Sequence, residues 1–242
     1  MSFRDPEPTS NPLSRAAEGF RIFTFSGIEV RLHWMWFLVA AWQMDQRKGV
    51  YQSPLWMVCE YLGLFLLVLL HEFGHAFACR QTGGSANRIL LWPLGGVAYV
   101  SAPQRPGAQL WTIAAGPLVN LALIPVLWIL GSVLFSMGLL EMHPDAWRFL
   151  RTLTFINIVL LVFNMLPIFP LDGGQILRSV LWFFIGPLKS LKVASIVGLF
   201  GGACLVGYAL WTMSIWTGVL AFYALSQSWS AFQAVRSAET RP

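Results

Sequence analysis

The sequence predicts an all-α polytopic membrane protein with about six transmembrane helices. Of its 242 residues, 56% are hydrophobic and only 11% are charged, and its mean hydropathy is positive. A soluble domain of this length does not need so much apolar surface, so the composition assigns the chain to the membrane class. Several apolar runs also approach the roughly 20 residues that a helix needs to cross a bilayer.

Six apolar segments follow one another and are the expected spans. The first is short, and the last contains the polar stretch SQSWSAFQ. The expected helices lie at residues 32–44, 55–80, 109–137, 149–169, 191–211 and 215–232.

The polar, proline-bearing segment 1–20 has no apolar signal-peptide core, so we expect a flexible cytosolic N-terminal tail. Residues 21–236 are expected to form one membrane-embedded domain with its core at 55–181. Residues 237–242 are expected to be a short cytosolic tail. With six crossings most Arg and Lys residues fall on the N-terminal side, which predicts a cytosolic N-terminus by the positive-inside rule. These cations are scattered in loops rather than clustered with aromatic residues, which argues against a nucleic-acid partner.

Three ionisable residues interrupt the second apolar run, in the stretch LLVLLHEFGHAFAC. His71 and His75 are four residues apart, so on a helix both imidazoles can reach one ion, while Glu72 lies about 100° around the helix. This spacing is typical of zinc hydrolases. His75 precedes Arg80, at the expected cytosolic end of the helix, by five residues, which predicts a site in the cytosolic half of the bilayer. The alternative is that the two histidines and the glutamate only satisfy one another between helices.

A site with two histidines is incomplete, because catalytic zinc usually takes three protein ligands and a water. Asp172 is the one aspartate near a membrane segment on the cytosolic side, in the run NMLPIFPLDGG. Pro167 and Pro170 break the fourth helix there, and the two glycines allow a sharp bend. Broken backbone is not tolerated against lipid, so this segment is expected to face protein or a hydrated cavity. Taken alone, it also fits a helix end with an incidental aspartate.

The sequence resembles the site-2 protease family of intramembrane zinc metalloproteases. The resemblance rests on HEFGH at 71–75, GPLVN at 116–120 and NMLPIFPLDGG at 164–174, in the family's order, and it spans roughly residues 55–181. The segment RILLWPLGGVAYV, residues 88–100, is similar to the family's membrane-associated β region, so a small hairpin or reentrant region is expected there. No segment fits the PDZ or CBS domains of longer members, which suggests a short form.

The resemblance implies one Zn²⁺ per active site, with His71, His75 and Asp172 as ligands and Glu72 as the catalytic carboxylate. The implied activity is hydrolysis of peptide bonds in or near transmembrane segments of membrane protein substrates, as in regulated intramembrane proteolysis. The expected partners are a transmembrane substrate, the lipid bilayer and a separate regulatory membrane protein. The expected location is a bacterial-type plasma membrane.

Two further groups of residues are candidates for substrate contacts. The side-chain amides of Asn120 and Asn164 have the right depth to stabilise an oxyanion or contact substrate, although each also fits an interhelical hydrogen bond. The uncharged run LGGVAYV predicts an edge strand that pairs with an unwound substrate, with a shielding hairpin or reentrant loop as the alternative. The candidate pairing residues are Gly95, Gly96, Val97, Ala98 and Tyr99.

Two other functions stay open at this point. A catalytically inactive zinc-binding membrane scaffold would keep the ligands, but it has little need for Glu72. A zinc transporter needs ligands along a path across the bilayer, and the other half of the membrane offers only Glu60, which is expected to reach the outer interface.

Overall fold

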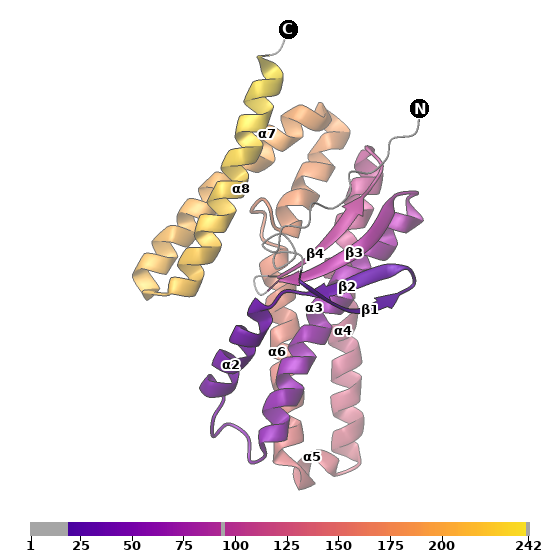
Figure 1. Cartoon of the computed structure of the whole chain (residues 1–242), viewed down its shortest axis with the longest axis vertical. Helices are drawn as coiled ribbons and strands as arrows, with labels where there is room; N and C mark the ends of the chain where they lie inside the picture. The colour runs from indigo at the N-terminus through magenta and orange to yellow at the C-terminus, as the bar shows by residue number, and fades with distance from the viewer. Residues whose placement is uncertain (1–18, 93–94, 241–242) are drawn as a thin grey trace.

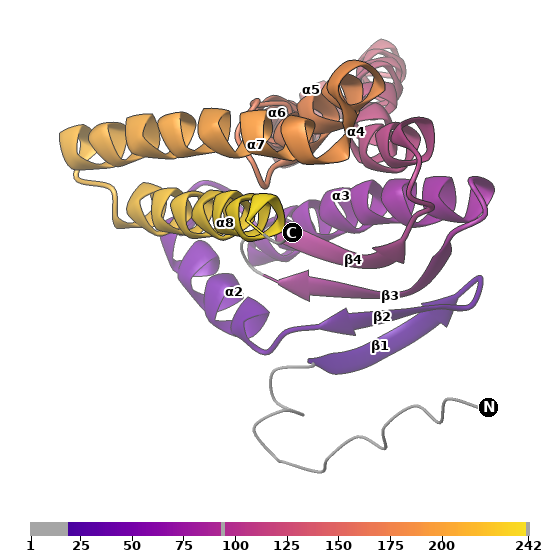
Figure 2. The ribbon, with the colours of Figure 1, turned by 90° about the horizontal axis from the view of Figure 1, so that it is seen from above.

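The computed structural model describes residues 19–92 and 95–240 as a mostly helical chain with a small β-sheet (Figures 1 and 2). Most of the predicted N-terminal tail therefore lies outside the described residues. Helices α3, α4 and α6 pack together, and α7 and α8 form a second pair beside them (Figure 1). The elements are β1 (Phe20–Phe25), β2 (Ile28–Leu32), α2 (Met35–Gln46), α3 (Pro54–Gln81), β3 (Ser85–Trp92), β4 (Gly95–Ser101), α4 (Pro106–Ser136), α5 (Leu139–Met142), α6 (Pro144–Asn164), α7 (Asp172–Thr212) and α8 (Ile215–Glu239).

Four of the described helices, α3, α4, α6 and α7, are long and apolar enough to cross a membrane. Helix α2 has 12 residues, or about 18 Å at 1.5 Å per residue, which is short of a hydrocarbon core of about 30 Å. Helix α8 is long enough, with 25 residues, but it carries the polar stretch noted above and is not among the four. The prediction of several apolar spans is confirmed, whereas the count of about six is not.

Helix α7 differs from the helix expected at residues 191–211, because it begins at Asp172. The chain bends sharply within it at Gly186, which has φ 78° and precedes Pro187. A positive φ suits glycine, and the proline removes a helical hydrogen bond, so the bend follows from this pair. Beyond the bend, α7 runs alongside α8 (Figures 1 and 2).

The sheet has the strand order β1-β2-β3-β4, with a parallel β2–β3 pair between two antiparallel hairpins. The β3–β4 hairpin confirms the β region predicted at 88–100. The β1–β2 hairpin was not predicted, and its turn residues Ser26 and Gly27 both have positive φ. The helix expected from residue 32 starts at Met35 instead, because Leu32 is still part of β2. The next residue, His33, donates its backbone N–H to Leu91 O.

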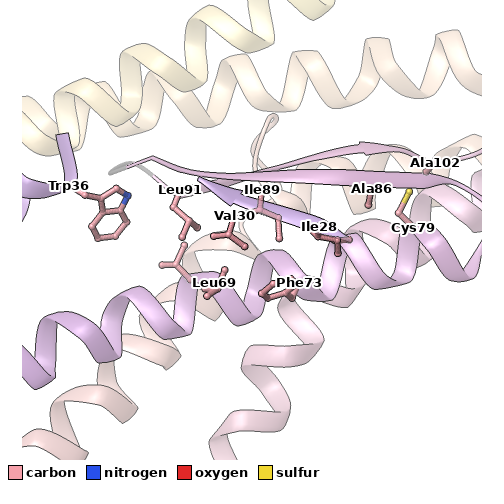
Figure 3. Close-up of a cluster of buried hydrophobic side chains, with 12 residues drawn as sticks. Ile28, Val30, Trp36, Leu69, Phe73, Cys79, Ala86, Ile89, Leu91 and Ala102 are labelled. Atoms are coloured by element: carbon pink, nitrogen blue, oxygen red, sulfur yellow. The ribbon is translucent and has the colours of Figure 1, made fainter. Parts of the chain in front are cut away.

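One face of the sheet packs on α3 and forms the main buried core (Figure 3). Val30 and Ile89 are fully buried there, opposite Leu69 and Phe73 of α3. Burying an aliphatic or aromatic side chain of this size stabilises a fold by about 1.5–3 kcal/mol. Because His71, Glu72 and His75 occupy the same turns of α3, this core fixes the helix that carries them.

A second anchor holds the C-terminal end of α3. The guanidinium of Arg80 donates hydrogen bonds to the backbone oxygens of Ser26 and Gly27 in the β1–β2 turn and to that of Ala86 in β3. The Arg80 side chain therefore links the end of α3 to both the β1–β2 hairpin and the β3–β4 hairpin.

Towards the other end of α3, Glu60 is fully buried within the protein. Its carboxylate accepts hydrogen bonds from Arg47 Nε at 2.7 Å and from the hydroxyl of Tyr51. Burial, together with the bond to Glu60, raises the pKa of Tyr51 to about 12, so this hydroxyl stays a donor at neutral pH. The network ties the loop between α2 and α3 to the helix.

We expect Glu60→Leu to lower the free energy of unfolding by about 2 to 3 kcal/mol, because it leaves the Tyr51 hydroxyl buried without its acceptor. This is less than the roughly 3–5 kcal/mol for breaking a fully buried ion pair, since the Arg47 side chain is 35% exposed. Denaturant unfolding in mild detergent measures the change. The exposed Glu141 provides the control, and Glu141→Gln should unfold like the wild type. Equal unfolding curves for Glu60→Leu and the wild type would contradict this role.

Candidate metal centre

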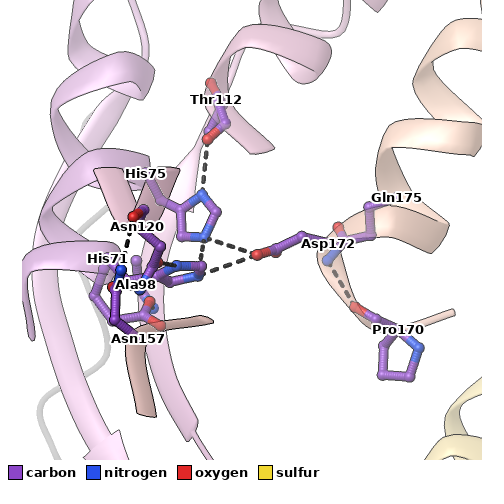
Figure 4. A network of polar contacts seen from close by, with 10 residues as sticks. His71, His75, Ala98, Thr112, Asn120, Asn157, Pro170, Asp172 and Gln175 are labelled. Carbon is purple, nitrogen blue, oxygen red and sulfur yellow. Dashed lines mark hydrogen bonds and ion pairs between the residues drawn. The ribbon is translucent and has the colours of Figure 1, made fainter. Parts of the chain in front are cut away.

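Helix α3 presents His71 and His75 on one face (Figure 4), and Glu72 lies close to both. All three side chains are buried. The Nε2 atoms of the two histidines lie 3.1 Å apart. The spacing of four residues therefore brings both ring nitrogens to one point.

Asp172 reaches the same point from the start of α7 (Figure 4). Its Oδ2 lies 3.0 Å from His71 Nε2 and 3.5 Å from His75 Nε2. The two glycines after it let the preceding loop fold tightly over the first turn of α7. A Cβ on Gly173 would lie 2.3 Å from Met165 O, and one on Gly174 would lie 2.4 Å from Phe169 N. The sequence predicted a break before Asp172, and α6 indeed ends at Asn164.

The hydrogen bonds behind the histidines determine which ring nitrogens face Asp172. His75 Nδ1 lies 2.8 Å from the backbone oxygen of Thr112, and His71 Nδ1 lies 2.6 Å from Asn120 Oδ1. Both partners are acceptors, so each neutral ring carries its proton on Nδ1 and turns an Nε2 lone pair towards the other ring. With both protons on Nδ1, Asp172 Oδ2 has no hydrogen-bond donor among the described residues. Three electron-rich atoms thus meet in a buried space, an arrangement that a cation would stabilise.

The spacing of these three atoms fits a zinc ion. Zinc binds imidazole nitrogen and carboxylate oxygen at about 2.0–2.2 Å in tetrahedral geometry, which sets ligand atoms about 3.3–3.5 Å apart. The separations of 3.0, 3.1 and 3.5 Å are close to this edge length. Two histidines and one carboxylate also match a catalytic set with a fourth position for water. Gly116 keeps the space open, because a Cβ there would lie 2.3 Å from His75 Nε2.

Glu72 lies close to the two histidines but is held differently from Asp172. One of its carboxylate oxygens lies within 4.8 Å of a ring nitrogen of each histidine, so proximity alone would also admit it as a ligand. Its Oε2 accepts a hydrogen bond from the backbone N–H of Ala98 in β4 at 3.0 Å. Asp172 is the stronger candidate for a third ligand, because its Oδ2 approaches both Nε2 atoms to 3.5 Å or less.

The predicted asparagine contacts separate into two kinds. Asn120 is fully buried and bonded to His71, behind the ring. Asn164 instead lines the cavity next to the histidines. Sequence reasoning missed Asn157, which is fully buried on α6 and hydrogen-bonded to Asn120. The one polar residue in the apolar run FINIVLLVF is Asn157, two helical turns before Asn164, and this was the available signal.

The cavity has a volume of about 530 Å³ and lies between β4, α3, α6 and the start of α7. Of the predicted pairing strand, Gly96 and Ala98 line it. In the β3–β4 ladder, Gly95 pairs with Trp92 and Val97 pairs with Leu90. Tyr99 is exposed and lies under the Arg88 guanidinium. Because β4 is the last strand of the sheet, its free edge faces the cavity.

Comparisons with known proteins match this chain to a single family. The model of peptidase family M50 matches residues 60–147 and 140–208. A zinc metalloprotease of Methanocaldococcus jannaschii is 34% identical over 198 residues, which cover 81% of this chain and 55% of that protein. The stage IV sporulation protein FB of Bacillus subtilis is 36% identical over 118 residues, 48% of this chain and 38% of its own length. The chain therefore spans about half the length, or less, of these curated relatives.

Among solved structures, the site-2 protease from Methanocaldococcus jannaschii superposes with a TM-score of 0.62 at 29% sequence identity. The match covers 88% of this chain and 94% of that one. The likeness therefore extends over nearly the whole described fold.

Proposed function

The chain belongs to peptidase family M50, and from this premise we propose that it is a zinc-dependent intramembrane protease that hydrolyses peptide bonds in or near transmembrane segments of membrane proteins. The observation that carries the proposal is the triangle of His71 Nε2, His75 Nε2 and Asp172 Oδ2, with edges of 3.0 to 3.5 Å. When bound there, a zinc ion would supply a Lewis acid that polarises the scissile carbonyl and lowers the pKa of a bound water.

The protein's own residues carry the proton transfers in this proposal. The Glu72 carboxylate takes a proton from the attacking water and then delivers it to the leaving amine. Its position next to both histidines suits this role. The side-chain amide of Asn164, on the cavity wall, is the candidate donor to the developing oxyanion. Asn120 is already committed to His71, so we assign it to holding that ring rather than to the oxyanion.

The free edge of β4 is the proposed docking place for an unwound substrate. A transmembrane helix hides its peptide bonds in internal hydrogen bonds, so the cleaved segment must first become extended. An extended segment can then pair with a sheet edge by β-augmentation. At present Glu72 accepts the outward N–H of Ala98. A substrate carbonyl that takes over this N–H would release the carboxylate for catalysis.

This arrangement predicts that Gly96 tolerates no side chain. A Cβ at this position would lie 2.1 Å from Glu72 Cγ and 2.4 Å from Glu72 Oε1, so Gly96→Ala must displace the catalytic carboxylate. We expect its cleavage rate to fall at least about tenfold, because small displacements of catalytic groups are costly, while bound zinc stays at the wild-type level. Gly107→Ala is the control, since the nearest atom to its Cβ is 3.7 Å away. A wild-type rate for Gly96→Ala would argue against this packing.

We also propose the orientation of the site in the membrane. Arg80 and Arg105 lie at the adjoining ends of α3 and α4, and His75 is five residues, or about 8 Å, from Arg80 along the helix. The positive-inside rule then supports a site in the cytosolic half of the membrane and a cytosolic N-terminus. A bacterial-type plasma membrane is part of the same proposal. A single membrane-embedded domain over residues 21–236 and a separate regulatory membrane protein belong to the same proposal.

Chelation and restoration of zinc test the proposed activity directly. We expect purified protein in proteoliposomes to cleave members of a panel of single-span substrates, to lose this activity with a zinc chelator, and to regain it with added Zn²⁺. The readouts are substrate fragments and zinc per protein. Bound zinc without cleavage of any substrate would favour an inactive scaffold. Zinc flux across the proteoliposome membrane would favour a transporter.

A further inference from the structure

We propose that Asn157 of α6 is a positioning residue that fixes the proton of His71 on Nδ1 by orienting the amide of Asn120. The inference rests on the proposed zinc chemistry of this site. Asn120 and Asn157 are both 0% exposed. They come from α4 and α6, and His71 comes from α3, so one chain of side-chain contacts joins three helices (Figure 4).

Two reciprocal hydrogen bonds orient the asparagines. Asn157 Nδ2 donates to the backbone oxygen of Asn120 at 2.8 Å, and Asn120 Nδ2 donates to Asn157 Oδ1 at 2.8 Å. A backbone oxygen only accepts hydrogen bonds, so Asn157 must direct its NH₂ group at the Asn120 backbone oxygen. Its own side-chain oxygen then points to the Asn120 side chain. That oxygen in turn needs a donor, which fixes the Asn120 amide with its NH₂ group towards α6. Asn120 Oδ1 is left facing His71.

The consequence is a fixed tautomer of His71. Since Asn120 Oδ1 lies 2.6 Å from His71 Nδ1, this nitrogen carries the proton and Nε2 keeps its lone pair for a metal. A reversed Asn120 amide would instead place N–H against Nδ1 and favour a proton on Nε2, in the space between the ligands. His75 needs no such help, because its Nδ1 faces the backbone oxygen of Thr112. Only one of the two histidines therefore depends on another side chain for its tautomer.

The first experiment removes the orienting group. We expect Asn157→Leu, which keeps the branched shape of the side chain but removes its polar atoms, to weaken zinc binding by about 10- to 100-fold, the usual effect of losing hydrogen-bonded partners behind a metal ligand. A competing chelator dye in detergent measures the affinity. Thr154→Val, on the same helix, is the control. Its hydroxyl donates to the backbone oxygen of Leu150 in the preceding turn, so the zinc affinity of this variant should equal the wild-type value.

The second experiment separates orientation from packing. In Asn120→Asp, either oxygen of the carboxylate can accept from His71, so no residue is needed to orient it. Adding Asn157→Leu to Asn120→Asp should therefore change zinc affinity far less than it does in the wild-type background. Equal losses in the two backgrounds would show that Asn157 acts through packing and would overturn the proposal. The test is a double-mutant cycle, whose interaction energy isolates this coupling.

A measurement on the unmutated chain keeps the proposal open to refutation even if Asn157→Leu does not fold. The chain has four histidines, and ring nitrogen chemical shifts of metal-free protein report the tautomer of each. We expect a proton on Nδ1 of His71, where Asn120 Oδ1 accepts it, and an Nδ1 without a proton would overturn the inference. This readout needs neither zinc nor a substrate. If the protein binds zinc and shows this tautomer but cleaves nothing, the proposed function fails while the role of Asn157 stands.

Discussion

Glu72→Gln is expected to abolish cleavage while the protein keeps its zinc. The amide has nearly the size of the carboxylate, and its oxygen can still accept the N–H of Ala98, now bonded at 3.0 Å. It cannot take up a proton from an attacking water. General base catalysis contributes about 10²- to 10⁴-fold to a rate, so we expect a loss of that order. Initial rates on a single-span substrate and zinc per protein are the two measurements.

These two readouts distinguish the roles open to Glu72. Lost activity with full zinc supports the general base, whereas lost zinc would make Glu72 a ligand. Glu141→Gln removes an exposed carboxylate on α5 and should keep the wild-type rate. Cleavage by Glu72→Gln at the wild-type rate would overturn the assignment of Glu72.

The residues of the site were accessible from sequence because their signals are local or rare. The spacing of His71 and His75 follows from helix geometry alone. Asp172 stood out because aspartates near a membrane segment are scarce and because prolines break the helix before it. The structure brings these residues together, to within 3.5 Å for the two Nε2 atoms and Asp172 Oδ2. The hydrogen bonds behind the ligands could not be predicted, since Asn157 meets Asn120 only after α4 and α6 pack.

The β1–β2 hairpin was missed although its sequence carries a signal. Ile28 and Val30 alternate with Glu29 and Arg31, and a Ser-Gly turn precedes them, which is typical of a hairpin with positive φ at both turn residues. Because the chain is so apolar, Leu32 continues directly into the following apolar run, and the pattern of long apolar runs therefore predicted a helix from Leu32 instead of a strand that ends there. The parallel pairing of β2 with β3 is a long-range contact that no local pattern encodes. Consequently the hairpin at 88–100 was predicted, but not the four-stranded sheet to which it belongs.

Removing the charge of the third ligand should have an effect that zinc itself can reverse. Asp172 is the one anionic group with an oxygen within 3.5 Å of both Nε2 atoms among the described residues. In Asp172→Asn a neutral amide replaces the carboxylate. Losing a residue that only hydrogen-bonds a metal ligand weakens metal binding by up to roughly 100-fold, so we expect the loss of a ligand's charge to weaken zinc binding by more than that. Cleavage at low zinc should be lost with it, as measured by zinc titration and substrate fragments.

The zinc dependence separates this variant from Glu72→Gln. Binding follows mass action, so high zinc should restore part of the cleavage by Asp172→Asn, whereas no zinc concentration should restore Glu72→Gln. Asp45→Asn is the control, because that carboxylate is 61% exposed and pairs with the nearby Lys48. Wild-type zinc affinity in Asp172→Asn would exclude Asp172 as a ligand. Among the described residues, Glu72 would then be the next candidate for a third ligand, since it lies within 4.8 Å of the same two histidines.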